Sequence, residues 1–176
     1  MSWSEVPAPK TSPGPTRRAA LTLLALPLAG CFRPMLAENA EASRLRGLIA
    51  LPAANTRTRY YLGESLAARL GRPARAELRL EVDLALSEQG LAITPDSAIT
   101  RRTVIAIAPW RLVRAGLDAP VLAAAERAEA GYNETADLFA TRAAKRDVEA
   151  RLAREIGERI ARSILARAST VEAALS

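Results

Sequence analysis

The chain has 176 residues, a formal net charge of +6 and no histidine, and this length suits one compact domain that buries a core without disulfides or a metal. Without histidine, the chain lacks the commonest general base and metal ligand, which excludes every Ser-His and Cys-His catalytic arrangement. The single cysteine, Cys31, excludes an internal disulfide, and the mixed signs of charge along the chain argue against a nucleic-acid partner.

The first thirty residues have the organisation of a signal peptide. Arg17-Arg18 precede an apolar run over 19–29, which is much shorter than the roughly 20 residues needed to span a bilayer. The run ends in Leu28-Ala29-Gly30-Cys31, small residues followed at once by a cysteine. This segment resembles the bacterial lipobox. The resemblance implies that residues 1–30 are removed and that Cys31, the new N-terminus, carries a diacylglyceryl group and a further acyl chain such as palmitate.

The acyl chains on Cys31 would anchor the mature protein, because each buried methylene adds about 0.8 kcal/mol of membrane affinity. Phe32 follows the cysteine, in place of the aspartate that is associated with retention in the inner membrane. By resemblance, the expected location is therefore the outer membrane, on its periplasmic side. Residues 31–44 are expected to form a lipidated tether that leads into a single domain over 45–168.

A short strand and a helix are expected at the start of that domain. Leu48 to Leu51 is an apolar run that ends at Pro52, which is consistent with a buried strand. Asn55 or Thr56 is expected to cap a helix that continues to about Leu70, where Gly71 would stop it.

Strands follow the helix. Over 76–86, leucine and valine alternate with mostly charged residues, so one face of this strand should be buried and the other wet. Gln89-Gly90 predicts a turn, and the next strand is expected over 100–113. Pro109 inside it lacks an N–H and therefore suits an edge strand or a bulge. A hairpin turn is expected over 115–120.

The remaining segments comprise one ambiguous stretch and one long helix. Residues 121–130 are rich in alanine, which favours a helix, whereas their place after a hairpin turn allows a strand. From about 140 to 168 the pattern is that of an amphipathic helix. Its apolar stripe consists of Ala144, Val148, Leu152, Ile156, Ile160 and Ile164. Residues 169–176 are expected to be a disordered tail.

The sequence carries little that points to catalysis. It has no glycine-rich phosphate loop and no metal-ligand cluster, so neither a cofactor nor a metal is expected. Glu81 and Asp83 would lie on one strand face, where a solvated surface explains them better than acid/base chemistry. A lipid-anchored hydrolase is disfavoured by the missing histidine. A Ser-Lys arrangement is the remaining possibility for such an enzyme, but Lys145, the sole mature lysine, is expected on a charged helix face. A non-enzymatic protein is therefore expected.

Several segments together resemble the LPS-assembly lipoprotein family, the lipoprotein subunit of the outer-membrane lipopolysaccharide translocon. The resemblance rests on the segment 31–35 after the lipobox, Tyr132-Asn133, Phe139-Ala140-Thr141, the pair Arg146-Asp147 and the closing run 152–165. It implies an α+β fold, a two-layer sandwich of two helices packed on a four-stranded, mostly antiparallel mixed sheet. It also implies that residues 121–130 form a strand.

The same resemblance implies a function. The lipoprotein would plug the β-barrel translocon, help that barrel to assemble and aid the insertion of lipopolysaccharide into the outer leaflet. Its partners would be the barrel, lipopolysaccharide and the membrane. The alternative is an auxiliary lipoprotein of an intermembrane phospholipid transporter, which the co-purifying partner would distinguish.

Basic side chains near the expected strand ends are the candidate lipopolysaccharide contacts: Arg101, Arg102, Arg111 and Arg114. A guanidinium group is suited to phosphate and carboxylate because it forms two parallel hydrogen bonds with them. Each of these arginines taken singly is explained at least as well as an ordinary exposed strand charge.

Overall fold

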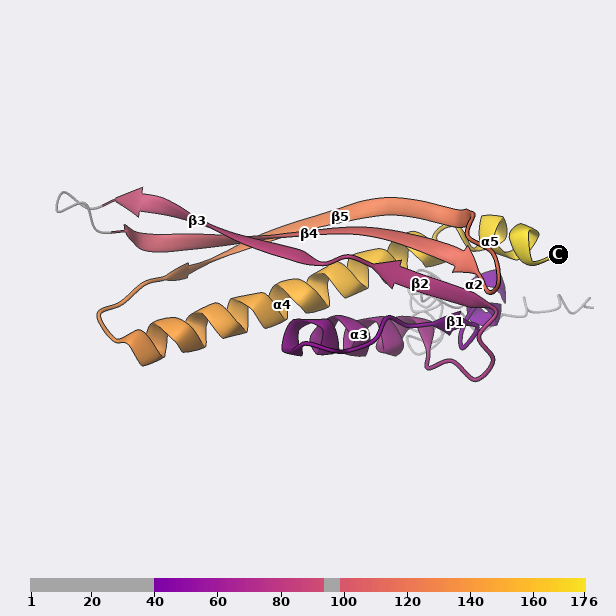
Figure 1. Ribbon diagram of the computed structural model, residues 1–176, viewed down its shortest axis with the longest axis horizontal. Coiled ribbons are helices and arrows are strands. Elements are labelled where there is room, and N and C mark those ends of the chain that lie inside the picture. The colour runs from indigo at the N-terminus through magenta and orange to yellow at the C-terminus, as the bar shows by residue number, and fades with distance from the viewer. Residues whose placement is uncertain (1–39, 94–98) are drawn as a thin grey trace, which may run out of the picture. The chain divides into compact units, whose positions relative to one another are not determined.

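The computed structural model describes residues 40–93 and 99–176. In chain order its elements are α2 (Ala40–Arg44), β1 (Ile49–Ala50), α3 (Arg57–Leu70), β2 (Leu78–Val82), β3 (Ala85–Ile93), β4 (Ile99–Arg114), β5 (Pro120–Asn133), α4 (Leu138–Leu165) and α5 (Ala168–Leu175) (Figure 1). The predicted signal peptide, Cys31 and most of the predicted tether lie outside the described residues. None of the helices that the structure describes is both long enough and apolar enough to cross a membrane.

The described strands form one mixed sheet. β1 and β2 are parallel, whereas β2, β3 and β5 are all antiparallel to β4. β2 and β3 pair with different halves of the same edge of β4, and β5 pairs with the other edge (Figure 1). The order across the sheet is therefore β1, β2, β4 and β5, and β3 continues the line of β2. The predicted α+β class, with helices layered on a mostly antiparallel mixed sheet, is confirmed.

The strand predicted over 76–86 is interrupted, which is why the sheet has five strands. β2 follows β4 as far as Trp110, and β3 takes over at Ile107, so the gap falls opposite Pro109. The N–H of Asp83 donates to the carbonyl of Pro109 at 3.0 Å. Because the two peptide groups of a strand residue point to the same side, the nitrogen of Pro109 also faces this gap. Its missing N–H therefore breaks no ladder bond, although β4 is a central strand rather than an edge.

The turn predicted at Gln89-Gly90 is wrong, because both residues lie inside β3. Gln89 pairs with Thr103 and Gly90 with Arg102, and register shifts follow on either side of Ala92. β4 extends far enough to provide partners for these residues, so the strand continues past the local turn signal. The glycine lies beside an irregularity in the ladder, which is a common place for glycine within a strand.

Residues 121–130 form a strand, as the resemblance implied, and not the helix that alanine favours. β5 pairs with β4 from Pro120 to Asn133, and its inward side chains Ala128 and Tyr132 are buried. The predicted hairpin turn is confirmed as well, and Gly116 adopts a φ of +85° within it.

The two long helices lie on the same face of the sheet (Figure 1). α3 begins after Thr56, whose Oγ1 accepts a hydrogen bond from the N–H of Arg59 at 3.2 Å, as the sequence predicts. The predicted apolar stripe of α4 is buried from Val148 to Ile164. No charged side chain is buried among the described residues, and the buried side chains with a polar atom are the aromatic Trp110 and Tyr132, so the core is a mostly apolar layer between helices and sheet.

Two expectations for the chain ends are wrong. Residues 40–44 belong to the expected tether, but they form α2, where Ala42 is buried. The disordered tail expected over 169–176 is mostly α5, where Val171 is fully buried. Such short helices are marginal alone. Here tertiary packing stabilises both helices. In α5, the guanidinium of Arg114 also donates to the carbonyls of Ala174 and Leu175 at 3.2 and 3.4 Å.

Candidate functional site

The helices that the structure describes cover one face of the sheet, and none of them covers the other. Along β4 the residues at even positions from Val104 to Leu112 are buried toward the helices, so the odd positions face the other side. We call this other side the open face. On β2 it carries Arg79 and Glu81, followed by Asp83 just after the strand; on β4 it carries Ile105, Ile107, Pro109 and Arg111; on β5 it carries Ala123, Ala125, Arg127 and Glu129.

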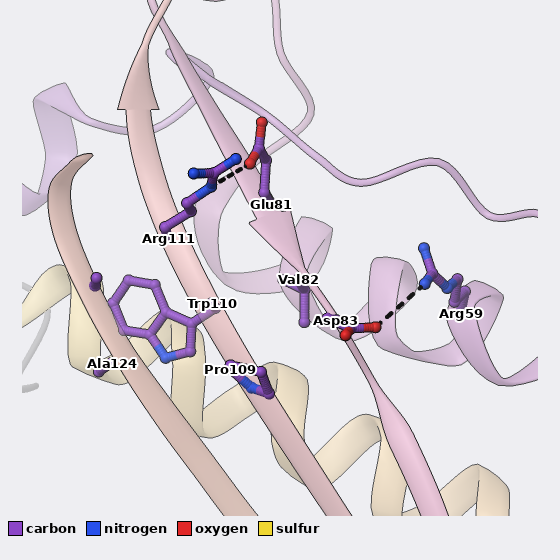
Figure 2. A pocket seen from close by; sticks show the side chains of 9 residues that line it. Arg59, Glu81, Val82, Asp83, Pro109, Trp110, Arg111 and Ala124 are labelled. Atoms are coloured by element: carbon purple, nitrogen blue, oxygen red, sulfur yellow. Dashed lines mark hydrogen bonds and ion pairs between the residues drawn. The ribbon is translucent and has the colours of Figure 1, made fainter. Parts of the chain in front are cut away.

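A hollow of about 700 Å³ lies at the interrupted part of the sheet (Figure 2). Its lining includes residues of the open face and, because the sheet is interrupted here, residues of the helix-covered side as well: Glu81, Asp83, Pro109, Arg111 and Ala123 of the first, and Val82, Trp110, Ala124 and, from α3, Arg59 of the second. Figure 2 shows two ion pairs, Arg111 with Glu81 on β2 and Arg59 with Asp83 just after the end of β2. The small side chain of Ala123 leaves the space beside Arg111 open.

The lining of this hollow carries two arginines, Arg59 and Arg111, and two carboxylates, Glu81 and Asp83. Glu81 is shared by two arginines, at 2.9 Å from Arg79 and 2.5 Å from Arg111. Arg59 lies 3.9 Å from Asp83. Arg79, which is not part of the lining, thus competes with Arg111 for the one carboxylate of Glu81. Exposed ion pairs of this kind contribute little stability, so a phosphate or carboxylate group from a ligand can compete for the guanidinium groups.

A second polar cluster lies on the helix-covered side, toward the far ends of β3, β4 and β5. Glu88 accepts hydrogen bonds from Lys145 at 2.5 Å and from the hydroxyl of Tyr132 at 2.7 Å. Arg102 bonds to Glu134 at 2.8 Å and lies 3.4 Å from Glu88. The cluster joins three strands to α4, so its role is to hold the end of the sheet on the helix.

The contacts in this cluster shift three pKa values. The hydrogen bond from Lys145, followed by that from Tyr132, lowers the pKa of Glu88. Burial, followed by the hydrogen bond to Glu88, raises the pKa of Tyr132 to about 12. The hydrogen bond to Glu134 raises the pKa of Arg102. Each shift favours the protonation state found at neutral pH, in which the cluster is fully bonded.

We predict that Glu88→Gln reduces the acid sensitivity of folding. The folded-state pKa of Glu88 lies below the ordinary value of 4.5, so its carboxylate stabilises the fold above that pH, and this contribution is lost as the pH falls through the folded-state pKa. Urea unfolding between pH 7 and pH 3 should show a smaller loss of unfolding free energy in the variant. Loss of the ionised acceptor should also cost about 1–3 kcal/mol at neutral pH. Glu64→Gln, at an exposed position on α3, is the control, and an equal flattening there would contradict the prediction.

The structure does not bring the four candidate arginines together. Arg101 and Arg111 are on the open face, separated by about 33 Å of strand, at about 3.3 Å per residue. Arg102 and Arg114 are on the helix side, where the first belongs to the Glu88 cluster and the second holds the end of α5. Arg111 lines the 700 Å³ hollow, whereas Arg101 lines a separate hollow of about 400 Å³ with Thr103 and Gly131.

Several residues of these sites were not expected from the sequence. Asp83 has the solvated position that the sequence predicts, with a side chain that is 83% exposed, whereas Glu81 is 32% exposed and pairs with Arg111. Lys145 was placed on a charged helix face, and it binds Glu88. The two are 57 positions apart, so no local pattern could have shown this contact. Among the described residues there is no group of three or more metal-binding side chains.

Comparisons with known proteins identify the fold. A scan against protein-family models and a search of curated proteins find no match. Among solved structures, a candidate lipoprotein from Caulobacter crescentus aligns with a TM-score of 0.58 and 22% identity, over 73% of this chain and 96% of that one. Rare lipoprotein B from Shewanella oneidensis aligns with a TM-score of 0.47 and 16% identity, over 72% of this chain and 96% of that one. A minor lipoprotein from Acinetobacter baumannii aligns with a TM-score of 0.49 and 13% identity, over 68% of this chain and 91% of that one. The first of these likenesses shows that the chain shares its fold with a solved protein.

Proposed function

We propose that this chain is a non-enzymatic outer-membrane lipoprotein that plugs a β-barrel lipopolysaccharide translocon, assists its assembly and aids the delivery of lipopolysaccharide to the outer leaflet. The anchor is Cys31, after removal of the signal peptide. Support for the lipid anchor comes from the lipobox sequence and from the candidate lipoprotein of Caulobacter crescentus, whose fold this chain shares.

The arginines at the interrupted part of the sheet are the observation that carries the lipopolysaccharide part of the proposal. Arg79 and Arg111 share the single carboxylate of Glu81, so one guanidinium has unused capacity for an anion. The phosphates of lipid A are bidentate acceptors that match this donor geometry. Ile107, four positions before Arg111 on the same face of β4, is 45% exposed and adds an apolar element to this face.

The plug role is supported by the distribution of charge. All the charged side chains of the described residues are at least partly exposed around an apolar core. A domain of this kind can sit in the polar lumen of a wide barrel without leaving a charge in an apolar environment. Barrels with many strands enclose a lumen wide enough to need such a plug.

Depletion of the protein in cells tests the translocon role. We expect a lower amount of folded barrel and accumulation of lipopolysaccharide in the periplasm or inner membrane. Mild-detergent purification should recover the barrel with the lipoprotein. Recovery of an inner-membrane transporter in its place would support the auxiliary lipoprotein of a phospholipid transporter, and normal surface lipopolysaccharide after depletion would refute the proposal.

We predict that the double variant Arg79→Ala, Arg111→Ala binds lipopolysaccharide about tenfold or more weakly, since it removes charge-assisted bonds worth roughly 1.5–3 kcal/mol each. Binding of purified protein to lipopolysaccharide in vitro is the measurement. The control is Arg142→Ala, Arg151→Ala, which removes the same charge from exposed positions on α4. An equal loss in both variants would mean that total charge alone attracts the ligand. Arg102 and Arg114 are poor choices for this test because each holds other elements in place.

A further inference from the structure

β5 is an open edge of the sheet. It pairs with β4 on one side, and no described strand pairs with its other side (Figure 1). The bond from Asp83 to Pro109 shows that the odd-numbered residues of β4 direct their peptide groups toward β2 and β3. Arg127 lies opposite Ile107, so the alternation of an antiparallel ladder directs its own N–H and C=O away from β4. A 14-residue edge of this kind is a template for another strand.

Arg159 of α4 closes this edge at one point. Its Nη1 donates to the carbonyl oxygen of Arg127 at 2.7 Å, while its Nη2 is held by Glu155 at 2.6 Å. These two side chains line a hollow of about 450 Å³ with Glu126 and Arg162. The guanidinium therefore occupies a backbone acceptor that an added strand would need.

The charges of β5 favour one kind of added strand, β5 of a second copy, because Arg127 and Glu129, which pair with each other at 3.0 Å within one chain, can exchange partners between two copies. Two antiparallel copies related by a two-fold axis at Ala128 would place Arg127 opposite Glu129 of the second copy, and Glu129 opposite Arg127 of the second copy. Both residues direct their peptide groups to the edge, so this register also satisfies the ladder. Moving the axis by one residue in either direction places arginine opposite arginine or glutamate opposite glutamate, which is unfavourable.

We propose that the β5 edge is a self-pairing surface, specific for the β5 edge of a second copy, and that Arg159 keeps it closed so that the chain remains a single copy. The interface is isologous, because the same residues contribute from both sides. Release of the guanidinium of Arg159 from the carbonyl of Arg127 exposes the hydrogen-bonding row and allows the pairing.

Replacement of Arg159 tests the proposal. Full-length protein in mild detergent is examined by native mass spectrometry and analytical ultracentrifugation over a range of concentrations. The wild type should be a single copy, and Arg159→Ala should form pairs whose fraction rises with concentration. Arg151→Ala is the control, since Arg151 is on the same helix and pairs with Asp147 at 3.1 Å; it should remain a single copy. Glu155→Gln, which releases Arg159 from its anchor, should pair to a smaller extent, and it provides the test should Arg159→Ala fail to fold.

Charge reversal then tests the register. Adding Arg127→Glu to Arg159→Ala places glutamate opposite glutamate, so pairing should weaken by roughly tenfold or more. Adding Glu129→Arg as well restores opposite charges in both places and should restore pairing. The proposal is overturned if Arg159→Ala remains a single copy at all concentrations, or if its association is insensitive to Arg127→Glu.

Discussion

Ile156→Asp is expected to unfold the domain under conditions in which the wild type is fully folded. Ile156 has no exposed surface and belongs to the same core cluster as Leu62 of α3 and Leu80 of β2. An aspartate there would bury a carboxylate with no partner in a core that has no buried charged side chain among the described residues. We expect a loss of about 5 kcal/mol or more, comparable with the whole stability of a typical domain, about 5–15 kcal/mol.

Circular dichroism during urea unfolding measures this effect. The control is Ala143→Asp, which introduces the same side chain at an exposed position of α4. It should change the free energy of unfolding by less than about 1 kcal/mol. A cooperative transition of Ile156→Asp near the wild-type midpoint would show that α4 does not bury this residue.

Gly157→Leu is expected to force α3 and α4 apart. A Cβ atom at Gly157 would lie 2.9 Å from the carbonyl oxygen of Leu62, closer than Cβ atoms pack, and 3.0 Å from the Cβ of Ser65, which is tighter than an ordinary contact. Ser65 is itself fixed at this crossing, because its hydroxyl donates to the carbonyl of Arg154 at 2.9 Å. The neighbours therefore cannot give way cheaply, and we expect a loss of about 3 kcal/mol or more from overpacking.

The matched control is Gly63→Leu on α3. A Cβ atom at Gly63 would meet no atom within 4 Å, and leucine is a better helix former than glycine by roughly 1 kcal/mol. Thermal unfolding should thus show a lower midpoint for Gly157→Leu and an equal or higher one for Gly63→Leu. Destabilisation of similar size in both would indicate a general intolerance of glycine replacement and not a tight crossing at Gly157.

The arginines show which part of a binding site can be predicted from residue type alone. Arg111 was a candidate because of its type and its place in a strand, and it does line a hollow. That Glu81 is its partner, and that Arg79 shares this carboxylate, depends on the register between β2 and β4. A shift of that register by one residue would place Glu81 and Arg111 on opposite faces.

The sequence by itself determined the elements whose signals are local. The helix after Thr56, the apolar stripe of α4 and the turn at Gly116 follow from residues within a few positions of one another, because capping, helical periodicity and positive φ angles act at that range. The tertiary structure decided the rest. β5 is a strand against its alanine propensity because β4 provides a partner along its whole length. The gap opposite Pro109, the burial of α5 and the bond between Glu88 and Lys145 likewise depend on groups that are brought together only by folding, from positions far apart in the chain.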